Sequence, residues 1–293
     1  LAVKILRQVL QESLGASQFL REIRHHGRLD HPRILPVLDS GSADWRLFFV
    51  LPYMEEGTLR SRLQRDRQLP YPDAIRITQA IADALAHAHE AGLVHRDVKP
   101  ENILFAGGHA HLGDFGIARA LERATGDSAT STGVVRGTPE YMSPEQAAGQ
   151  SEYDGRSDIY SLGCVLYEMV AGVPAFVGPT PQSVIAQRLS FRPTQIAQFR
   201  DSVPESLEAV VNRAMMVVLA DRFQTAREFA AALERVVPDA QSPPDRATTR
   251  IRAIRRRRFA WLGGLATIAV VAGSVIVAPA SVARSAARVT VTP

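Results

Sequence analysis

Cysteine is almost missing from this chain of 293 residues, since Cys164 is the only one. A single thiol excludes an intramolecular disulfide and fits a reducing compartment. Catalysis by that thiol is not expected, because Cys164 lies in the apolar run of residues 161–167, where a small buried residue is the usual interpretation. With 46% hydrophobic and 22% charged residues, the composition is typical of a globular chain rather than a disordered one.

Net positive charge is confined to one short run. The formal net charge is only +4, and arginines crowd into residues 246–258, immediately before an apolar stretch. A protein that binds nucleic acid would spread basic residues over a folded face or interleave them with stacking aromatic residues. We therefore expect no nucleic acid partner.

The histidines offer no metal-binding set. His87 and His89 stand two positions apart on a predicted helix, so they do not share a face, and no nearby cysteine or histidine completes a set of ligands. We interpret both as packing or hydrogen-bonding residues.

Composition divides the chain into four parts. Residues 1–237 are globular, residues 238–258 form a linker with prolines and then arginines, residues 259–283 carry no charge, and residues 284–293 form a short tail. The uncharged part is long enough to cross a hydrocarbon core of about 30 Å as a helix. A buried core helix is the alternative, but such helices seldom run uncharged for so long.

Arginine is more abundant before this predicted transmembrane helix than after it. Residues 255–258 are all arginine, whereas only Arg284 and Arg288 follow. The side that is richer in arginine usually stays in the cytoplasm. This distribution predicts a single-pass protein of the inner or plasma membrane, with a cytoplasmic globular part and an extracytoplasmic tail.

The hydrophobic pattern predicts a small strand-rich part followed by a larger helical part. Residues 1–6 read as a buried strand without a lead-in and begin with leucine rather than methionine, so we expect the chain to start within a domain. Further strand-like runs lie at 34–38 and 46–51, with an amphipathic helix at 17–29. Helices are then predicted at residues 71–91, 157–171, 204–216 and 225–236. This order predicts an α+β fold.

Two motifs carry the chemistry. The sequence His-Arg-Asp-Val-Lys-Pro-Glu-Asn begins at His95, and Asp-Phe-Gly begins at Asp114. Phosphoryl transfer to a hydroxyl needs a carboxylate to orient and deprotonate the nucleophile, oxygen ligands for magnesium, and a cation near the migrating group. Asp97 can serve as the base and Lys99 as the cation, while Asn102 and Asp114 offer the oxygen ligands.

Because both motifs occur in this order and with this gap, the sequence resembles the eukaryotic-like (Hanks-type) serine/threonine protein kinases of bacteria. The resemblance covers residues 1–237. It implies a two-lobed protein kinase fold with ATP and Mg²⁺ between the lobes, Mn²⁺ being an alternative metal. Lys4 resembles the strand lysine that holds the α- and β-phosphates, and Glu22 resembles its ion-pair partner.

The resemblance also implies how the adenine ring is held. Ala2 and Leu104 resemble the residues that sandwich the ring, Leu51 falls at the gatekeeper position, and Pro52 and Met54 fall in the hinge. Pro52 has no N–H, but the matching family position contributes a carbonyl, so Met54 N–H can still complete the recognition.

Residues 114–145 resemble an activation loop. In similar kinases the residue that matches Arg96 pairs with a phosphorylated loop residue, whose added charge orders the segment. We expect autophosphorylation among Thr130, Ser131 and Thr132. The resemblance also suggests a homodimer, because similar kinases often phosphorylate this loop in trans.

Two further sets of residues follow from the resemblance. Lys99 and Thr138 resemble the matching residues of serine/threonine kinases rather than those of tyrosine kinases. The expected substrates are therefore proteins with Ser or Thr hydroxyls. The resemblance implies a buried structural ion pair between Glu145 and Arg222, and implies that Asp158 braces the backbone of the catalytic segment.

One part of the family pattern is missing, because no Gly-x-Gly-x-x-Gly precedes Lys4. We favour an incomplete chain, since Lys4, Glu22, Asp97, Asn102 and Asp114 all remain. A catalytically silent, membrane-anchored pseudokinase scaffold is the alternative. A phosphotransferase for small molecules is a third hypothesis, but the long activation loop suits a protein substrate.

Overall fold

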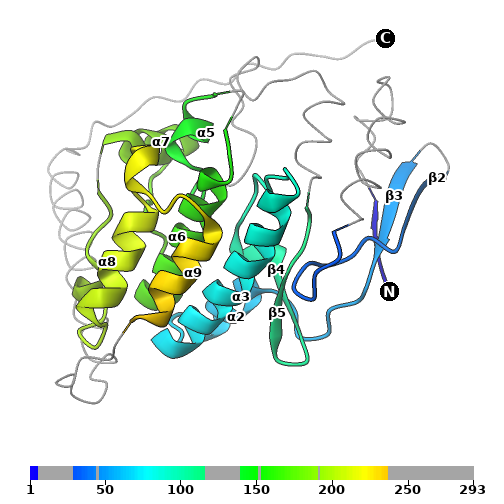
Figure 1. Ribbon diagram of the computed structural model, residues 1–293, viewed down its shortest axis with the longest axis horizontal. Helices are drawn as coiled ribbons and strands as arrows, with labels where there is room; N and C mark the ends of the chain where they lie inside the picture. The colour runs from blue at the N-terminus through cyan, green and yellow to red at the C-terminus, as the bar shows by residue number, and fades with distance from the viewer. Residues whose placement is uncertain (6–28, 44–45, 116–138, 151–152, 191, 237–293) are drawn as a thin grey trace, which may run out of the picture. The chain divides into compact units, whose positions relative to one another are not determined.

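Residues 1–5, 29–43, 46–115, 139–150, 153–190 and 192–236 are described by the structure, a computed structural model. They all fall within one unit, Leu1–Pro244. The order of elements is a small sheet, then helices interrupted by one hairpin (Figure 1). This mixture agrees with the predicted α+β class.

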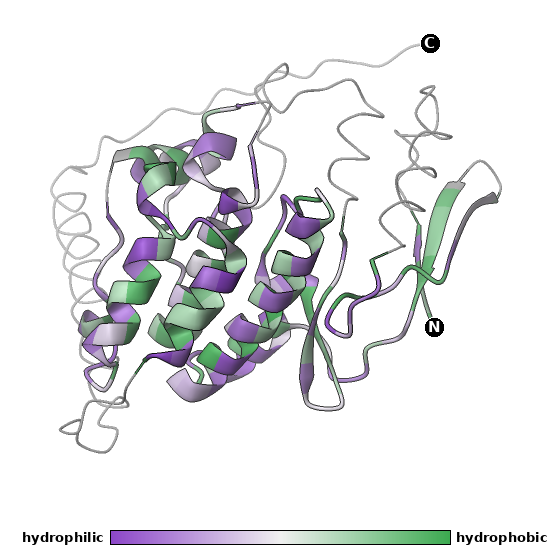
Figure 2. Ribbon diagram, in the orientation of Figure 1, coloured by the Kyte–Doolittle hydropathy of each residue, from purple (hydrophilic) through white to green (hydrophobic). Residues whose placement is uncertain are grey.

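An antiparallel sheet of three strands holds the N-terminal residues. Its order is β1 (Ala2–Ile5), β3 (Arg46–Leu51) and β2 (Asp39–Ala43). β3 lies in the centre because it is the hydrophobic strand, as Figure 2 shows, and its Phe49 and Leu51 are buried. The register places Ala2 opposite Leu51, so the two predicted adenine-site residues at the start and end of these strands are neighbours.

The helices that follow are α2 (Leu59–Asp66), α3 (Tyr71–Glu90), α6 (Arg156–Ala171), α8 (Glu205–Ala214) and α9 (Ala226–Glu234). α3 packs against α6 and α9, and α6 packs against α8 (Figure 1). Nearly every residue of α6 is buried, and its buried polar residues, such as Asp158 and Glu168, have hydrogen-bond partners. The main hydrophobic core therefore lies around α6.

Shorter elements position the catalytic segment between these helices. A 3-10 turn, Pro100–Asn102, leads into the hairpin of β4 (Ile103–Ala106) and β5 (His109–Leu112). Two more helices are α5 (Pro144–Ala147), which begins with a capping box at Ser143, and α7 (Pro181–Ser190).

Four helix predictions correspond to α3, α6, α8 and α9 with ends that differ by a few residues. The strand predicted at residues 34–38 is wrong. Only Ile34 forms an isolated bridge, with Leu112, because Pro36 lacks the N–H that a ladder would need. The strand in this region is the polar β2, and the helix predicted at 17–29 lies outside the described residues except for Leu29.

Within the described ranges, every helix is too short or too polar to cross a membrane. The linker at 238–258, the apolar helix predicted at 259–283 and the tail at 284–293 all lie outside those ranges.

Candidate active site

Asp97 lies at the centre of the catalytic segment. Its Oδ2 is 2.7 Å from Lys99 Nζ and accepts a hydrogen bond from Asn102 Nδ2 at 3.0 Å. Both donors reach the same oxygen, and no described residue donates to Oδ1. The carboxylate is thus oriented by two neighbours while one oxygen remains able to accept a proton.

Asn102 is buried and held in one orientation. Its Nδ2 donates to the Asp97 carbonyl at 2.8 Å as well as to the Asp97 carboxylate. Since the amide nitrogen donates to both the carbonyl and the carboxylate of Asp97, the amide oxygen is the atom left to bind a cation. Asn102 therefore fits the predicted role of a hard oxygen ligand.

Asp114 ends a short loop after β5 and contacts Lys4 on β1. Lys4 Nζ donates to both carboxylate oxygens of Asp114, so a lysine of the sheet meets the first residue of the Asp-Phe-Gly motif. The backbone of Asp114 has φ +63°, a left-handed conformation that costs about 1 kcal/mol or more in a residue other than glycine. Such strain at a charged residue is common in active sites. Glu22, the expected partner of Lys4, lies outside the described residues.

The described residues contain no cluster of three or more His, Cys, Asp or Glu side chains that could hold a metal alone. Asn102 and Asp114 supply one amide oxygen and one carboxylate. A divalent cation with few protein ligands keeps water and binds substrate phosphates, which is how magnesium is usually held. The residues present fit a cation that arrives with a nucleotide.

His95 joins the segments that carry Asp97 and Asp114. Its Nε2 is 2.9 Å from the Gly113 carbonyl, and its Nδ1 accepts the backbone N–H of Asp97 at 3.2 Å. These contacts assign the neutral tautomer with the proton on Nε2. The ring also meets Phe115 edge-on at 4.5 Å. His95 belongs to the motif, but the sequence indicated no role of its own for this residue.

Asp158, on α6, braces the backbone of the catalytic segment. Its carboxylate accepts the backbone N–H groups of His95 and Arg96 and contacts His89 Nε2, each at 2.8 Å. Burial alone would raise the pKa of Asp158, but the hydrogen bonds and nearby imidazoles outweigh it and lower that pKa. His89 is therefore a hydrogen-bonding residue, as interpreted, but one that serves the site.

The predicted adenine-site residues surround one edge of the sheet and the hairpin. Ala2 and Leu104 are half-buried, and Leu51 is buried. Pro52 and Met54 follow β3 directly, and the Met54 N–H donates to no described residue. This leaves the hinge donor available for a ligand.

Gly113 packs closely against Leu104. A Cβ at residue 113 would lie 2.8 Å from Leu104 Cδ1. The Gly113 N–H also donates to the Asn102 carbonyl at 2.8 Å. A side chain at residue 113 would therefore require the end of the Leu104 side chain, a predicted adenine contact, to shift.

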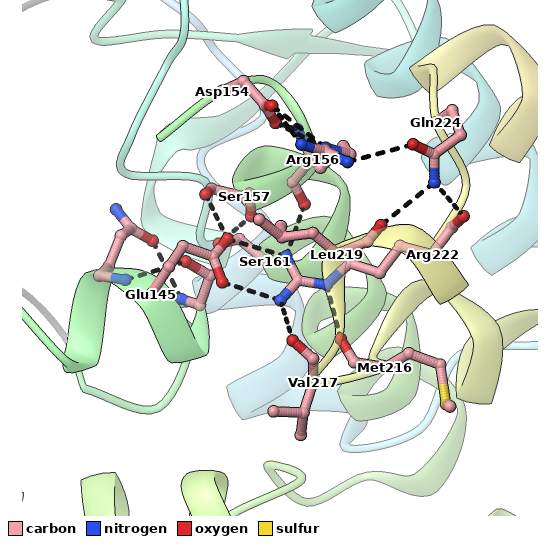
Figure 3. Close-up of polar contacts among 12 residues, drawn as sticks. Glu145, Asp154, Arg156, Ser157, Ser161, Met216, Val217, Leu219, Arg222 and Gln224 are labelled. Carbon is pink, nitrogen blue, oxygen red and sulfur yellow. Dashed lines mark hydrogen bonds and ion pairs between the residues drawn. The ribbon is translucent and has the colours of Figure 1, made fainter. Parts of the chain in front are cut away.

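Glu145 and Arg222 form the buried pair shown in Figure 3. Arg222 donates one nitrogen to each carboxylate oxygen at 2.8 Å, and Ser157 donates to Oε1. Burial opposes ionisation of Glu145, yet the bonds from Arg222 and Ser157 lower its pKa overall. Arg222 also donates to the carbonyls of Arg156, Met216 and Val217, so its guanidinium is well supplied with acceptors.

A second polar network was not predicted. Arg60 on α2 donates to Glu101 and Glu168 at 2.7 Å and to the Tyr141 hydroxyl, which in turn donates to Glu168. It links the catalytic segment to the segment before α5. Gln146 adds a bond from its Nε2 to the Arg96 carbonyl at 2.8 Å. These partners are far apart in sequence, and no motif indicated them.

Several predicted residues cannot be placed. Thr130, Ser131, Thr132 and Thr138 lie outside the described residues. Arg96 is described, with φ +72° and its guanidinium over the Tyr153 ring at 4.8 Å.

Comparison with known proteins identifies the arrangement. The family model described as "Protein kinase domain" matches residues 1–234. The chain belongs to the protein kinase domain family. Members of this family use ATP and a divalent metal. The contacts of Asp97, Asn102 and Asp114 fit that chemistry.

Two bacterial kinases are among the curated relatives of this kinase domain. It is 41% identical over 241 residues to a serine/threonine-protein kinase PknB of Mycobacterium leprae, covering 80% of this chain and 38% of the relative. The PknB of Mycolicibacterium smegmatis is 41% identical over 249 residues, with coverage of 82% and 40%. The chain thus spans about two fifths of the length of these relatives.

A solved structure shows the same fold. The crystal structure of a mutant of the Mycobacterium tuberculosis PknI kinase domain superposes with a TM-score of 0.60 at 32% identity, covering 79% of this chain and 83% of that one.

Proposed function

We propose that this kinase domain transfers the γ-phosphoryl group of ATP to Ser and Thr hydroxyls of proteins. The observation that carries the proposal is the catalytic segment, in which Asp97 contacts Lys99 at 2.7 Å and Asn102 at 3.0 Å. A base, a cation and an oxygen ligand are thereby held within one short segment. The named relatives, which are serine/threonine-protein kinases, support the choice of substrate hydroxyl.

The chain's residues divide the reaction between them. Asp97 orients the substrate hydroxyl and accepts its proton as the oxygen attacks the γ-phosphorus and the bond to ADP breaks. Lys99 neutralises charge on the moving group, and Lys4 is placed to hold the α- and β-phosphates. Asn102 and Asp114 would hold Mg²⁺, which would supply charge neutralisation at the phosphates.

The contact between Lys4 and Asp114 implies an exchange when nucleotide and metal bind. Both carboxylate oxygens of Asp114 accept from Lys4 Nζ. To hold a metal ion, the Asp114 carboxylate would have to share its oxygens or release the Lys4 ammonium group, which would then pair with the phosphates. Metal and nucleotide are thus expected to bind cooperatively.

We further propose autophosphorylation among Thr130, Ser131 and Thr132, and membrane anchoring through residues 259–283 with the kinase domain in the cytoplasm. The uncharged run and the arginines before it support the anchoring. Phosphorylation of one copy by another would make a homodimer the working unit.

The test is Mg²⁺-dependent transfer of label from γ-labelled ATP by the full-length gene product that contains this chain. Peptides with Ser or Thr should accept label, and small metabolites should not. Asp97→Asn should lower turnover by about 10²- to 10⁴-fold. Undiminished turnover would refute the role of Asp97, and an absence of transfer to any acceptor would favour a silent scaffold.

Trans-autophosphorylation and anchoring need separate measurements. Label that enters an Asp97→Asn protein only when active protein is added shows transfer in trans, and mass spectrometry shows whether residues 130–132 carry it. Membrane fractionation with and without residues 259–283 tests the anchor, which is rejected if both forms stay soluble.

A further inference from the structure

Two arginines are fully buried beside the same tyrosine, but only one is paired. Arg222 and Arg188 are both 0% exposed, and their guanidinium carbons lie 4.9 Å and 5.5 Å from the centre of the Tyr160 ring. Arg222 has Glu145 and backbone carbonyls as acceptors. For Arg188, none of the three guanidinium nitrogens has a hydrogen-bond partner in the described part of the chain.

Aromatic contact compensates Arg188 only in part. Its guanidinium lies over Tyr160 and also over Phe176, at 5.2 Å. Cation–π contacts attract the guanidinium group. The aromatic rings, however, do not accept hydrogen bonds from its five N–H groups as oxygen atoms do. A buried charge is ordinarily paired with an opposite charge, since desolvation is otherwise too costly.

Among the residues that the structure describes, the acids near Arg188 do not provide that opposite charge. Glu145 is held by Arg222 and Ser157, and Glu168 belongs to the Arg60 network. Burial raises the pKa of Cys164 to about 11, so this thiol is neutral at pH 7. Burial also raises the pKa of Tyr160 well above its usual value. The surroundings of Arg188 therefore retain an unbalanced positive charge.

Exposed residues adjoin Arg188 and Phe176 in the sequence. Phe176 and Arg188 are buried, but the next residues in sequence, Val177 and Leu189, are 63% and 45% exposed. The segment that holds Phe176 and Val177 is joined to α7 by a bond from Gln187 Nε2 to the Val177 carbonyl at 3.0 Å.

We propose that Arg188 is the receptor for a small oxyanion, a phosphate or a carboxylate, bound between α7 and the Tyr160 ring. The fork of guanidinium N–H groups matches two oxygens of either group. The site is separate from the catalytic segment, so the proposal does not depend on kinase activity.

The test measures thermal unfolding of the full-length protein in phosphate, sulfate or acetate, each against chloride at equal ionic strength. At ten times the dissociation constant we expect an anion to raise Tm by about 3 °C or more, and the Arg188→Met protein to show no such shift. The response to phosphate or to acetate identifies the preferred source of the oxyanion. Lys4→Met removes the cation of the nucleotide site and should leave the shift intact.

A second readout protects the test from a folding defect. Calorimetric titration with phosphate should detect binding to the wild-type and Lys4→Met proteins, and at least tenfold weaker binding to Arg188→Lys, which keeps the charge but loses the fork. In chloride alone, Arg188→Met should unfold at a higher temperature than the wild type. The proposal is overturned if all three anions leave wild-type Tm unchanged, or if Arg188→Met responds as the wild type does.

Discussion

Asp158 Oδ1 accepts the backbone N–H of Arg96 at 2.8 Å, which joins the buried start of α6 to the residue before the catalytic base. Because the donor is the main-chain N–H of Arg96, this bond fixes the backbone next to Asp97 independently of the position of the Arg96 side chain. An Asp158→Asn protein keeps one oxygen acceptor but presents an NH₂ group to the other donors. We expect a loss of about 1–3 kcal/mol in the free energy of unfolding and a fall in kcat. Urea unfolding and steady-state kinetics measure the two effects, and unchanged kcat would show that Asp158 does not position the segment.

Stability is expected to fall in acid because of Asp158 and Glu145. The pKa of each carboxyl is lowered in the folded state, so each group stabilises the fold fully above its unfolded pKa of about 4. This contribution is lost as the pH falls below that value through the lower folded pKa. Urea unfolding between pH 3 and pH 7 should show a decline below about pH 4. Asp158→Asn should make that decline shallower, and an equal slope in both proteins would contradict the assignment.

Two arginine–glutamate pairs in the same domain provide a matched comparison. Arg222 and Glu145 are buried, whereas Arg227 and Glu90 form an exposed pair at 2.8 Å. Arg222→Met leaves a buried carboxylate unpaired and should cost about 3–5 kcal/mol in the free energy of unfolding. Arg227→Met should leave the urea midpoint almost unchanged, because solvent screens the exposed pair. Equal shifts of the midpoint would show that burial does not govern the strength of these pairs.

The tautomer of His95 can be observed directly. Its Nδ1 accepts the Asp97 N–H and its Nε2 faces the Gly113 carbonyl, so the proton belongs on Nε2. In ¹⁵N spectra we expect an Nε2 that carries hydrogen and an Nδ1 that does not, with the signals assigned from their loss in His95→Asn. A proton on Nδ1 would mean that the ring does not accept from Asp97.

The fold was most predictable where hydrophobic periodicity was strong. The limits of α3 and α6 follow from long apolar patterns, and β3 follows from a short one. β2 was missed because Asp-Ser-Gly-Ser-Ala is polar and becomes a strand only by pairing with β3. A strand was instead expected at 34–38, where Pro36 interrupts the backbone donors.

The candidate site was predictable where its residues share a motif. Asp97, Lys99 and Asn102 are close in sequence, so a short turn is enough to bring them together. The Arg60 network could not be foreseen, since its partners are 41 to 108 positions away and meet only through packing of α2 on later elements. Arg188 gave no signal either, because the sequence does not show whether an arginine is buried without a partner.

Gly113 lies against three residues of the candidate site. Its open Cβ position faces Leu104. Its N–H donates to the Asn102 carbonyl, and its own carbonyl lies 2.9 Å from His95 Nε2. One added methyl group would meet Leu104 Cδ1, the end of a flexible side chain, and would leave the two main-chain contacts with Asn102 and His95 in place. A small side chain at this position should therefore be tolerated when Leu104 turns aside, and its effect should fall on the nucleotide base before the cation or the catalytic base.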